Sequence, residues 1–230
     1  MCLLPNFKFY SKEREYKSIN FIKSNEKHED CSVYNKDLIS LTGNIDYNGY
    51  FQSYKYFDKI KNILIDDFKI INVDVINKTN NIMEDIKEKF KNMKLVAIHV
   101  RGGDKSKSIS NTWWNLNETY LKKSLSHFGD DVVYLIFNTQ VEKNINNILY
   151  NNIPKNRRFF IQYDVLTDFN LMKHCHHFIL TNSTLGWMAA YLSNINTNKK
   201  VIHPHIIFQN ENDPRNKLDD YIPNNWIIVK

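Results

Sequence analysis

The sequence predicts an α/β fold in which a parallel β-sheet is flanked by helices. From Leu95 onward, short β-rich runs alternate with helical patterns, and this alternation is typical of successive βαβ units. The run at residues 132–137 is continuously apolar, as expected of a strand that is buried on both faces of a parallel sheet. A Rossmann-like domain is therefore expected over residues 91–230.

The elements of this domain follow one another in a regular order. A first strand is expected at residues 95–100, followed by a loop and a helix that ends at Gly129 as its C-terminal cap. After the strand at 132–137, Thr139 and Glu142 form a capping-box pattern before the next helix. Further strands are expected at 157–161, 177–180 and 200–203, with helices at 168–175, capped by Thr167, and 183–192.

The first ninety residues differ from the rest and are expected to form a reduced N-terminal region, residues 1–90, with a bridging helix. Apolar side chains recur there at helical spacing, at Phe57, Ile60, Ile63, Leu64 and Phe68. Residues 1 to about 45 carry no pattern that assigns an element. No repeat or low-complexity linker marks a sharp domain boundary.

Composition and charge exclude several classes of protein. The chain carries a formal net charge of +6, but its lysines are interleaved with acidic residues, which favours a solvated surface over nucleic-acid binding. Its cysteines, Cys2, Cys31 and Cys175, have no metal-type spacing and suit a reducing, cytoplasmic compartment. The N-terminal apolar run is too short for a signal peptide, and no stretch approaches the ~20 apolar residues of a membrane span.

The motif "HVRGGD", residues 99–104, stands where the first strand ends and its loop begins. Open parallel sheets bind ligands at the carboxyl ends of their strands. Gly102 and Gly103 allow close backbone approach, and the guanidinium of Arg101 suits phosphate. Diphosphate binding is one reading; a surface turn in which Arg101 pairs with Asp104 is the other.

The motif "TNSTLGW", residues 181–187, brings polar side chains to the start of a helix. Backbone N–H groups at a helix N-terminus favour anions, so Asn182, Ser183 and Thr184 are candidates for a second phosphate contact. Ser183 and Thr184 are equally typical of ordinary helix caps. Both readings stay open for this segment taken alone.

Two other segments attract attention. "KHCHH", residues 173–177, places potential metal ligands next to one another, but consecutive residues point in different directions, so metal binding is not expected. "DYNGYFQSYKYF", residues 46–57, is rich in aromatic residues. It is equally consistent with a loop that covers a sugar ring and with a hydrophobic anchor for the bridging helix.

Taken in order, these segments resemble the α-1,2-fucosyltransferase family, glycosyltransferase family 11. That family carries "GYWQSxKYF", "HxRRGD" and "DxxxMxxCxHxIxxNSTFSWWGAWL", and this chain has "GYFQSYKYF", "HVRGGD" and "DFNLMKHCHHFILTNSTLGWMAAYL". The endings "VIHPHIIF" and "DDYIPNNWIIV" are similar to the family's "VIAPxxWF" and "DIIPxxWI". The resemblance covers residues 47–229.

The resemblance implies a GT-B-like glycosyltransferase with a Rossmann-like C-terminal donor-binding lobe. It implies inverting transfer of L-fucose from GDP-fucose to a hydroxyl of a glycan acceptor, with no metal and no other cofactor. By the same resemblance, His99 and Arg101 face the diphosphate as the catalytic pair, and Asp104 braces their loop. Asn182, Ser183 and Thr184 match the second phosphate-facing stretch, while Asp168 matches an acidic position for which helix capping is the expected role.

The chain also departs from the family pattern. The second arginine of "HxRRGD" is Gly102 here, Met188 and Ala189 replace a tryptophan and a glycine, and the family's "GGLGNQMFQYA" segment has no counterpart. The N-terminal lobe is therefore expected to be reduced, rebuilt from residues 1–45, or supplied by a partner protein. Peripheral membrane association is compatible with this picture. The alternative to an active enzyme is a relative that binds a GDP-sugar without turning it over.

Overall fold

The structure is a computed structural model that describes residues 22–25, 27, 30–100, 113–138, 143–194 and 198–230. The described chain packs into two compact units. The smaller unit comprises the residues up to Lys69 together with 212–224, and the larger unit comprises residues 70–211 together with 225–230. The sequence analysis divides the chain after residue 90. In the structure, the packing divides it between Lys69 and Ile70, and residues 212–224 pack with the smaller unit.

The larger unit is an α/β fold built on a six-stranded sheet of strand order β5-β4-β3-β6-β7-β8. Every neighbouring pair in this sheet is parallel. The strands are β3 (Lys94–Val100), β4 (Val132–Asn138), β5 (Arg158–Ile161), β6 (His177–Ile179), β7 (Val201–Pro204) and β8 (Ile227–Val229). The parallel sheet expected from the alternation of strands and helices is thus confirmed, and β8 is an additional strand that the sequence did not indicate.

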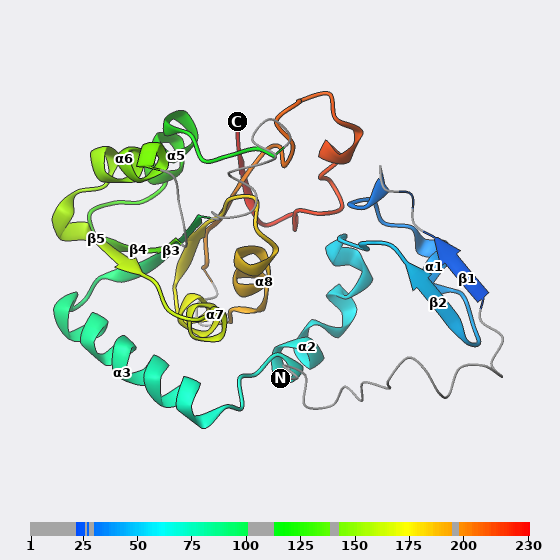
Figure 1. Cartoon of the computed structure of the whole chain (residues 1–230), viewed down its shortest axis with the longest axis horizontal. Helices are drawn as coiled ribbons and strands as arrows, with labels where there is room; N and C mark the ends of the chain where they lie inside the picture. The colour runs from blue at the N-terminus through cyan, green and yellow to red at the C-terminus, as the bar shows by residue number, and fades with distance from the viewer. Residues whose placement is uncertain (1–21, 26, 28–29, 101–112, 139–142, 195–197) are drawn as a thin grey trace. The chain divides into compact units, whose positions relative to one another are not determined.

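Helices cover both faces of this sheet (Figure 1). One face carries α5 (Glu118–Leu125) and α6 (Lys143–Asn152). The other carries α3 (Val73–Lys89), α7 (Val165–Lys173) and α8 (Thr184–Leu192). Because both faces are covered, the central strands β3 and β4 are apolar over most of their length.

The alternation of side chains along β3 shows how this core is built. Val96 and Ile98 are fully buried and belong to one apolar cluster with Leu121 of α5 and Leu149 of α6. Ala97, which points to the opposite face of the sheet, is also buried. A strand with two buried faces cannot shift its register by a residue without moving its neighbours, so the register of β3 is fixed up to its carboxyl end at Val100.

Two expected helix ends are corrected by the structure. Helix α5 ends at Leu125 with Ser126 as its C-cap, so Gly129 lies beyond the cap. Helix α7 begins at Val165 and its N-cap is Asp164; Thr167 is inside the first turn, where its hydroxyl donates to Asp164 Oδ2 at 2.7 Å. The carboxylate is the stronger acceptor and takes the cap position. The predicted capping box at Thr139 and Glu142 lies outside the described residues.

The smaller unit holds two short parallel strands, β1 (Ile22–Asn25) and β2 (Ile45–Asn48). Between them lies the single-turn helix α1 (Lys36–Ile39), and after them come 3₁₀ turns at Tyr54–Tyr56 and Asp58–Ile60 and helix α2 (Lys61–Asp67). The expected bridging helix is therefore shorter than its pattern predicts, and Ile60 and Ile63 are exposed. No helix in the described part of the chain is long and apolar enough to cross a membrane.

Tyr120 of α5 ties the carboxyl edge of the sheet together. Its hydroxyl donates to the carbonyl of Leu180 at 2.6 Å and lies 3.3 Å from that of Ile202, which places it between the ends of β6 and β7. Burial raises the pKa of this phenol far above its usual value, so it stays a donor.

We expect Tyr120→Phe to lower the free energy of unfolding by about 1–2 kcal/mol, because a buried carbonyl loses its donor. Urea unfolding of the purified chain measures this. Tyr150→Phe on α6 is the matched control, since Tyr150 is exposed, and it should change stability by less than about 0.5 kcal/mol. Equal effects of the two substitutions would contradict a stabilising role for the Tyr120 hydroxyl.

Candidate functional site

The order of the strands creates a topological switch point at one edge of the sheet. From β3 the chain runs outward through β4 and β5 and then returns to the other side of β3 with β6, β7 and β8. The connections therefore leave in opposite directions at the carboxyl ends of β3 and β6, which pair side by side. Such a switch point is where open α/β sheets bind ligands.

The two motifs that the sequence singled out lie on these neighbouring strand ends. His99 is next to last in β3, and residues 180–183 link β6 to α8. The hydroxyl of Thr181 donates to the carbonyl of His99 at 2.7 Å. The structure thus brings His99 next to the Asn182–Ser183–Thr184 stretch, although Asn182 lies 83 positions after His99 in the sequence.

Gly186 permits this close approach. A β-carbon placed on Gly186 would lie 3.0 Å from Nδ1 of His99 and 3.1 Å from its Cβ. Real β-carbons seldom come so near to other atoms, so the first turn of α8 packs against the His99 ring only because residue 186 has no side chain. The sequence shows that Gly186 follows Ser183 at the start of a helix, but it does not show that Gly186 packs against His99.

The start of α8 has the character of an anion site. Ser183 is the N-cap of this helix, and its side chain makes no capping hydrogen bond to the first turn. The N–H groups of that turn therefore are not satisfied by the cap residue, and the positive end of the helix dipole lies at the same place. Ser183 is buried whereas Thr184 is exposed, so Thr184 is the residue that presents its side chain to solvent at this edge.

Asn182 has a structural contact of its own. Its amide Nδ2 donates to the carbonyl of Ile207 at 3.0 Å, and the same carbonyl accepts from the N–H of Trp114 at 2.9 Å. Beside it, the rings of Trp113 and Phe208 pack with centroids 4.6 Å apart. These residues lie beside the switch point, and the sequence alone did not indicate them because their pairing joins segments far apart in the chain.

The remaining candidates of the first motif, Arg101, Gly102, Gly103 and Asp104, lie outside the described residues. Their assignment to the donor site stays a prediction that rests on the motif. What the structure establishes is that the chain enters this loop from the carboxyl end of β3, beside α8.

Asp168 lies in the first turn of α7, where a capping role was expected. Its Oδ1 accepts the N–H of Tyr163 at 3.1 Å, while Asp164 accepts the N–H of Thr167 at 3.0 Å. The two carboxylates thus satisfy backbone donors on either side of the helix start. Burial raises the pKa of Asp168 to about 6, whereas the contacts with Thr167 and Lys78 hold the pKa of Asp164 well below its usual value.

The "KHCHH" segment lies at the opposite end of the strands, where β3 and β7 begin. Nδ1 of His176 accepts the N–H of Leu95 at 3.0 Å, and Nδ1 of His177 accepts the N–H of Lys200 at 3.0 Å. Cys175 is buried, and burial raises the pKa of its thiol. Within the described residues there is no group of three or more His, Cys, Asp or Glu side chains that could hold a metal ion.

The aromatic stretch at residues 46–57 lies in the smaller unit, where its rings pack mainly on one another. Phe51 contacts Tyr47 at 5.7 Å and Tyr56 at 5.9 Å between ring centroids, and Tyr56 contacts Tyr34 at 5.0 Å. Tyr54 is buried. The stretch therefore acts as an internal anchor of this unit, and only part of it faces a hollow.

Comparison with known proteins supports one family. The sequence profile described as "Glycosyl transferase family 11" matches residues 4–230, so the family match also includes residues 4–46, in which no motif was recognised. The chain is similar to an α-1,2-colitosyltransferase of Escherichia coli, with 23% identity over 210 residues that cover 84% of this chain and 66% of that relative. The chain thus spans just under two thirds of the length of this relative.

A solved structure, the β-Kdo 2,7-transferase KpsC of Thermosulfurimonas dismutans, aligns with 64% of this chain and 46% of its own length, at a TM-score of 0.30 and 14% sequence identity. That likeness is too slight to add to the assignment, which rests on the profile. The motif series, its placement on adjacent strand ends and the profile match agree with one another. The chain belongs to glycosyl transferase family 11.

Proposed function

We propose that the protein transfers L-fucose from GDP-fucose to a hydroxyl of a glycan acceptor in an inverting, metal-independent reaction. The observation that carries the proposal is the juxtaposition of His99 with the start of α8 at the switch point of the sheet. A diphosphate is the ligand chemistry that suits such a place, because helix N–H groups and the helix dipole both favour an anion. The proposed arrangement is GT-B-like, with the larger unit as the donor-binding lobe.

The chemistry required of the site follows from the leaving group. When the acceptor oxygen attacks the anomeric carbon of the sugar, the bond to the diphosphate breaks and GDP departs with an added negative charge. In the proposed site this charge is stabilised by Arg101 and by the N–H groups that begin α8, with Thr184 as a hydroxyl donor. His99 and Arg101 are the proposed catalytic residues, and Gly102, Gly103, Asp104, Asn182 and Ser183 complete the proposed donor-binding loops.

The identity of the transferred sugar is the finer part of the proposal. The name of the Escherichia coli relative specifies colitose and an α-1,2 linkage, so fucose has a named competitor. A transfer assay with GDP-fucose and GDP-colitose, offered separately with a panel of glycans, decides between them. Faster transfer from GDP-colitose would overturn fucose as the donor, while absence of product from both, with GDP still bound, would favour the non-catalytic relative suggested by Gly102.

The donor site itself is tested by binding. We expect calorimetry to show that GDP and GDP-fucose bind the native chain and that Arg101→Ala weakens both by about 10- to 100-fold, since a charge-assisted contact contributes about 1.5–3 kcal/mol. Lys122→Ala is the control, because it removes an exposed cation of α5 that pairs with Glu118. If both variants bound GDP equally well, Arg101 would have no place in the site.

Compartment and partners complete the proposal. The proposed location is cytoplasmic, because the three cysteines are not spaced as in a disulfide framework. The proposed partners are the GDP-sugar and a glycan, with a further protein as a candidate source of an additional lobe. We do not include a nucleic acid among them, since the charge pattern favours a solvated surface.

A further inference from the structure

The smaller unit contains a hollow of about 590 Å³, to which the aromatic segment at residues 46–57 contributes Tyr56. It is formed by residues from the end of β1 through α1, and by Tyr56 from the 3₁₀ turn that follows β2. Its size falls within the ~300–1,000 Å³ that ligand pockets usually occupy. We call it the tyrosine pocket, after Tyr34 and Tyr56 in its lining.

The two tyrosine rings supply an aromatic wall. Their centroids are 5.0 Å apart and their planes are tilted by 57°, and both side chains are half-buried. Partly exposed rings of this kind offer an apolar face to a ligand while keeping polar tips in contact with water. The C–H faces of a sugar ring are complementary to such a wall.

The charges in the pocket balance. Lys27 and Lys36 line it, and so do Asp30 and Asp37; Asp30 also pairs with Lys217 at 3.3 Å. A pocket for a phosphate or a carboxylate needs an excess of positive charge. A balanced lining favours an uncharged ligand that carries both donors and acceptors.

Two amide side chains add directional contacts. Asn25 accepts at its Oδ1 from Asn48 at 3.2 Å, and Asn35 accepts at its Oδ1 from the N–H of Asp37 at 3.0 Å. Both residues line the pocket, and a side-chain amide carries N–H donors besides its acceptor oxygen. Donors of this kind match hydroxyl oxygens.

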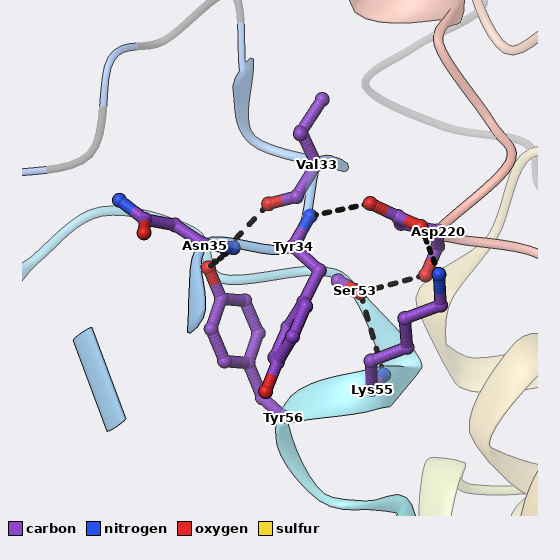
Figure 2. A network of polar contacts seen from close by, with 7 residues as sticks. All are labelled: Val33, Tyr34, Asn35, Ser53, Lys55, Tyr56 and Asp220. Atoms are coloured by element: carbon purple, nitrogen blue, oxygen red, sulfur yellow. Dashed lines mark hydrogen bonds and ion pairs between the residues drawn. The ribbon is translucent and has the colours of Figure 1, made fainter. Parts of the chain in front are cut away.

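The pocket is held in shape by a polar network around Asp220 (Figure 2). Asp220 accepts the N–H of Tyr34 at its Oδ2, 2.8 Å away, forms an ion pair with Lys55, and receives the Ser53 hydroxyl at its carbonyl, 2.7 Å away. The Tyr56 hydroxyl accepts the N–H of Asn35 at 2.9 Å. These contacts fix the aromatic wall before a ligand arrives, which lowers the entropic cost of binding.

We propose that the tyrosine pocket binds an uncharged sugar residue of the acceptor glycan. That this sugar belongs to the acceptor rests on the proposed function. The preference for a neutral sugar rests only on the rings, the balanced charges and the amide side chains of the pocket. The pocket thus supplies recognition of the acceptor within the smaller unit, separately from the nucleotide site of the larger one.

The test is a titration of the native chain, without nucleotide, by neutral disaccharides that end in galactose, glucose or N-acetylhexosamine, followed by saturation-transfer NMR and calorimetry. We expect at least one neutral disaccharide to bind and Tyr34→Ala to weaken it about tenfold, which corresponds to the loss of one stacked ring. Tyr34→Phe keeps the ring and should bind within about twofold of the native chain. Tyr50→Ala is the matched control, because Tyr50 is an exposed tyrosine of the same unit outside the lining.

Several results would overturn the proposal: no binding by any neutral disaccharide, preferential binding of a sialylated trisaccharide, or equal losses in the Tyr34→Ala and Tyr50→Ala variants. Thermal unfolding of each variant guards against a loss of folding, and Tyr34→Phe supplies the comparison if the alanine variant is unstable. GDP binding is measured in parallel. Disaccharide binding without GDP binding would refute the proposed donor site and leave the tyrosine pocket supported. GDP binding without disaccharide binding would refute the tyrosine pocket and leave the donor site supported.

Discussion

Replacing Gly186 with valine is expected to weaken GDP binding by about tenfold or more and to lower the free energy of unfolding by about 1–3 kcal/mol. A β-carbon at this position would lie 3.0 Å from Nδ1 and 3.1 Å from Cβ of His99. The methyl groups of valine require still more room, so either His99 or the first turn of α8 must shift. Both belong to the proposed diphosphate site.

Gly186→Ala gives a graded version of the same experiment. In most helices this change is stabilising, because glycine costs about 1 kcal/mol relative to alanine. Here the contact with His99 opposes that gain, so we expect little or no stabilisation and a smaller loss of GDP affinity than valine causes. Calorimetry with GDP and urea unfolding give the two readouts.

Gly129→Ala is the matched control for this series. A β-carbon at Gly129 would meet only Asp131 Oδ1, at 3.4 Å, which is an ordinary contact, and the residue lies outside the helices. It should leave both GDP affinity and stability close to native. If Gly186→Val bound GDP as the native chain does, the packing of α8 on His99 would be irrelevant to the nucleotide, and the proposed site would lose its main structural support.

The central strands were predictable because burial on both faces forces a local signature. The apolar runs of β3 and β4 mark them without any knowledge of their partners. β8 lacks such a signature, since it has three residues of which only Val229 is buried. β8 forms because it pairs with the edge of β7. The sequence of residues 227–229 alone contains no information about that edge.

The candidate site was predictable only in its parts. Each motif could be placed at a strand end, but the contact between His99 and Gly186 depends on β3 and β6 being neighbours. The same holds for the smaller unit, where Asp220 organises Tyr34 and Ser53 across more than 160 positions, the separations being 186 and 167. Local propensity contains nothing about such pairings, which are decided by tertiary packing.

Acidification is the second perturbation for which we expect a large effect. His203 in β7 is 1% exposed, and its Nδ1 lies 2.6 Å from the carbonyl of Pro204, an arrangement in which the neutral ring donates. Burial lowers the pKa of His203 to about 4, and burial together with neighbouring positive charge lowers the pKa of His177 to about 4 as well. In the unfolded chain both rings titrate near ~6.5.

The sign of the effect follows from these values. A histidine whose pKa is lower in the folded state contributes its full stability above pH ~6.5 and loses it as the pH falls toward about 4. For each ring this amounts to roughly 2 kcal/mol between pH 7 and pH 5. Asp168 acts in the opposite direction, because its pKa is raised to about 6 and its ionisation above that value costs stability; over the same interval it offsets roughly 1 kcal/mol.

Urea unfolding at pH 7 and pH 5 measures the balance. We expect the native chain to be less stable at pH 5 by roughly 2–3 kcal/mol, and His203→Phe to lose less on acidification than the native chain, whatever its stability at pH 7, because its buried ring cannot be protonated. Asp168→Asn should lose more stability than the native chain on acidification, since it removes the carboxyl group whose protonation stabilises the folded chain at low pH. If His203→Phe instead showed the native difference between the two pH values, protonation of the buried His203 ring would not be the cause, and the acid sensitivity would have to arise from other groups.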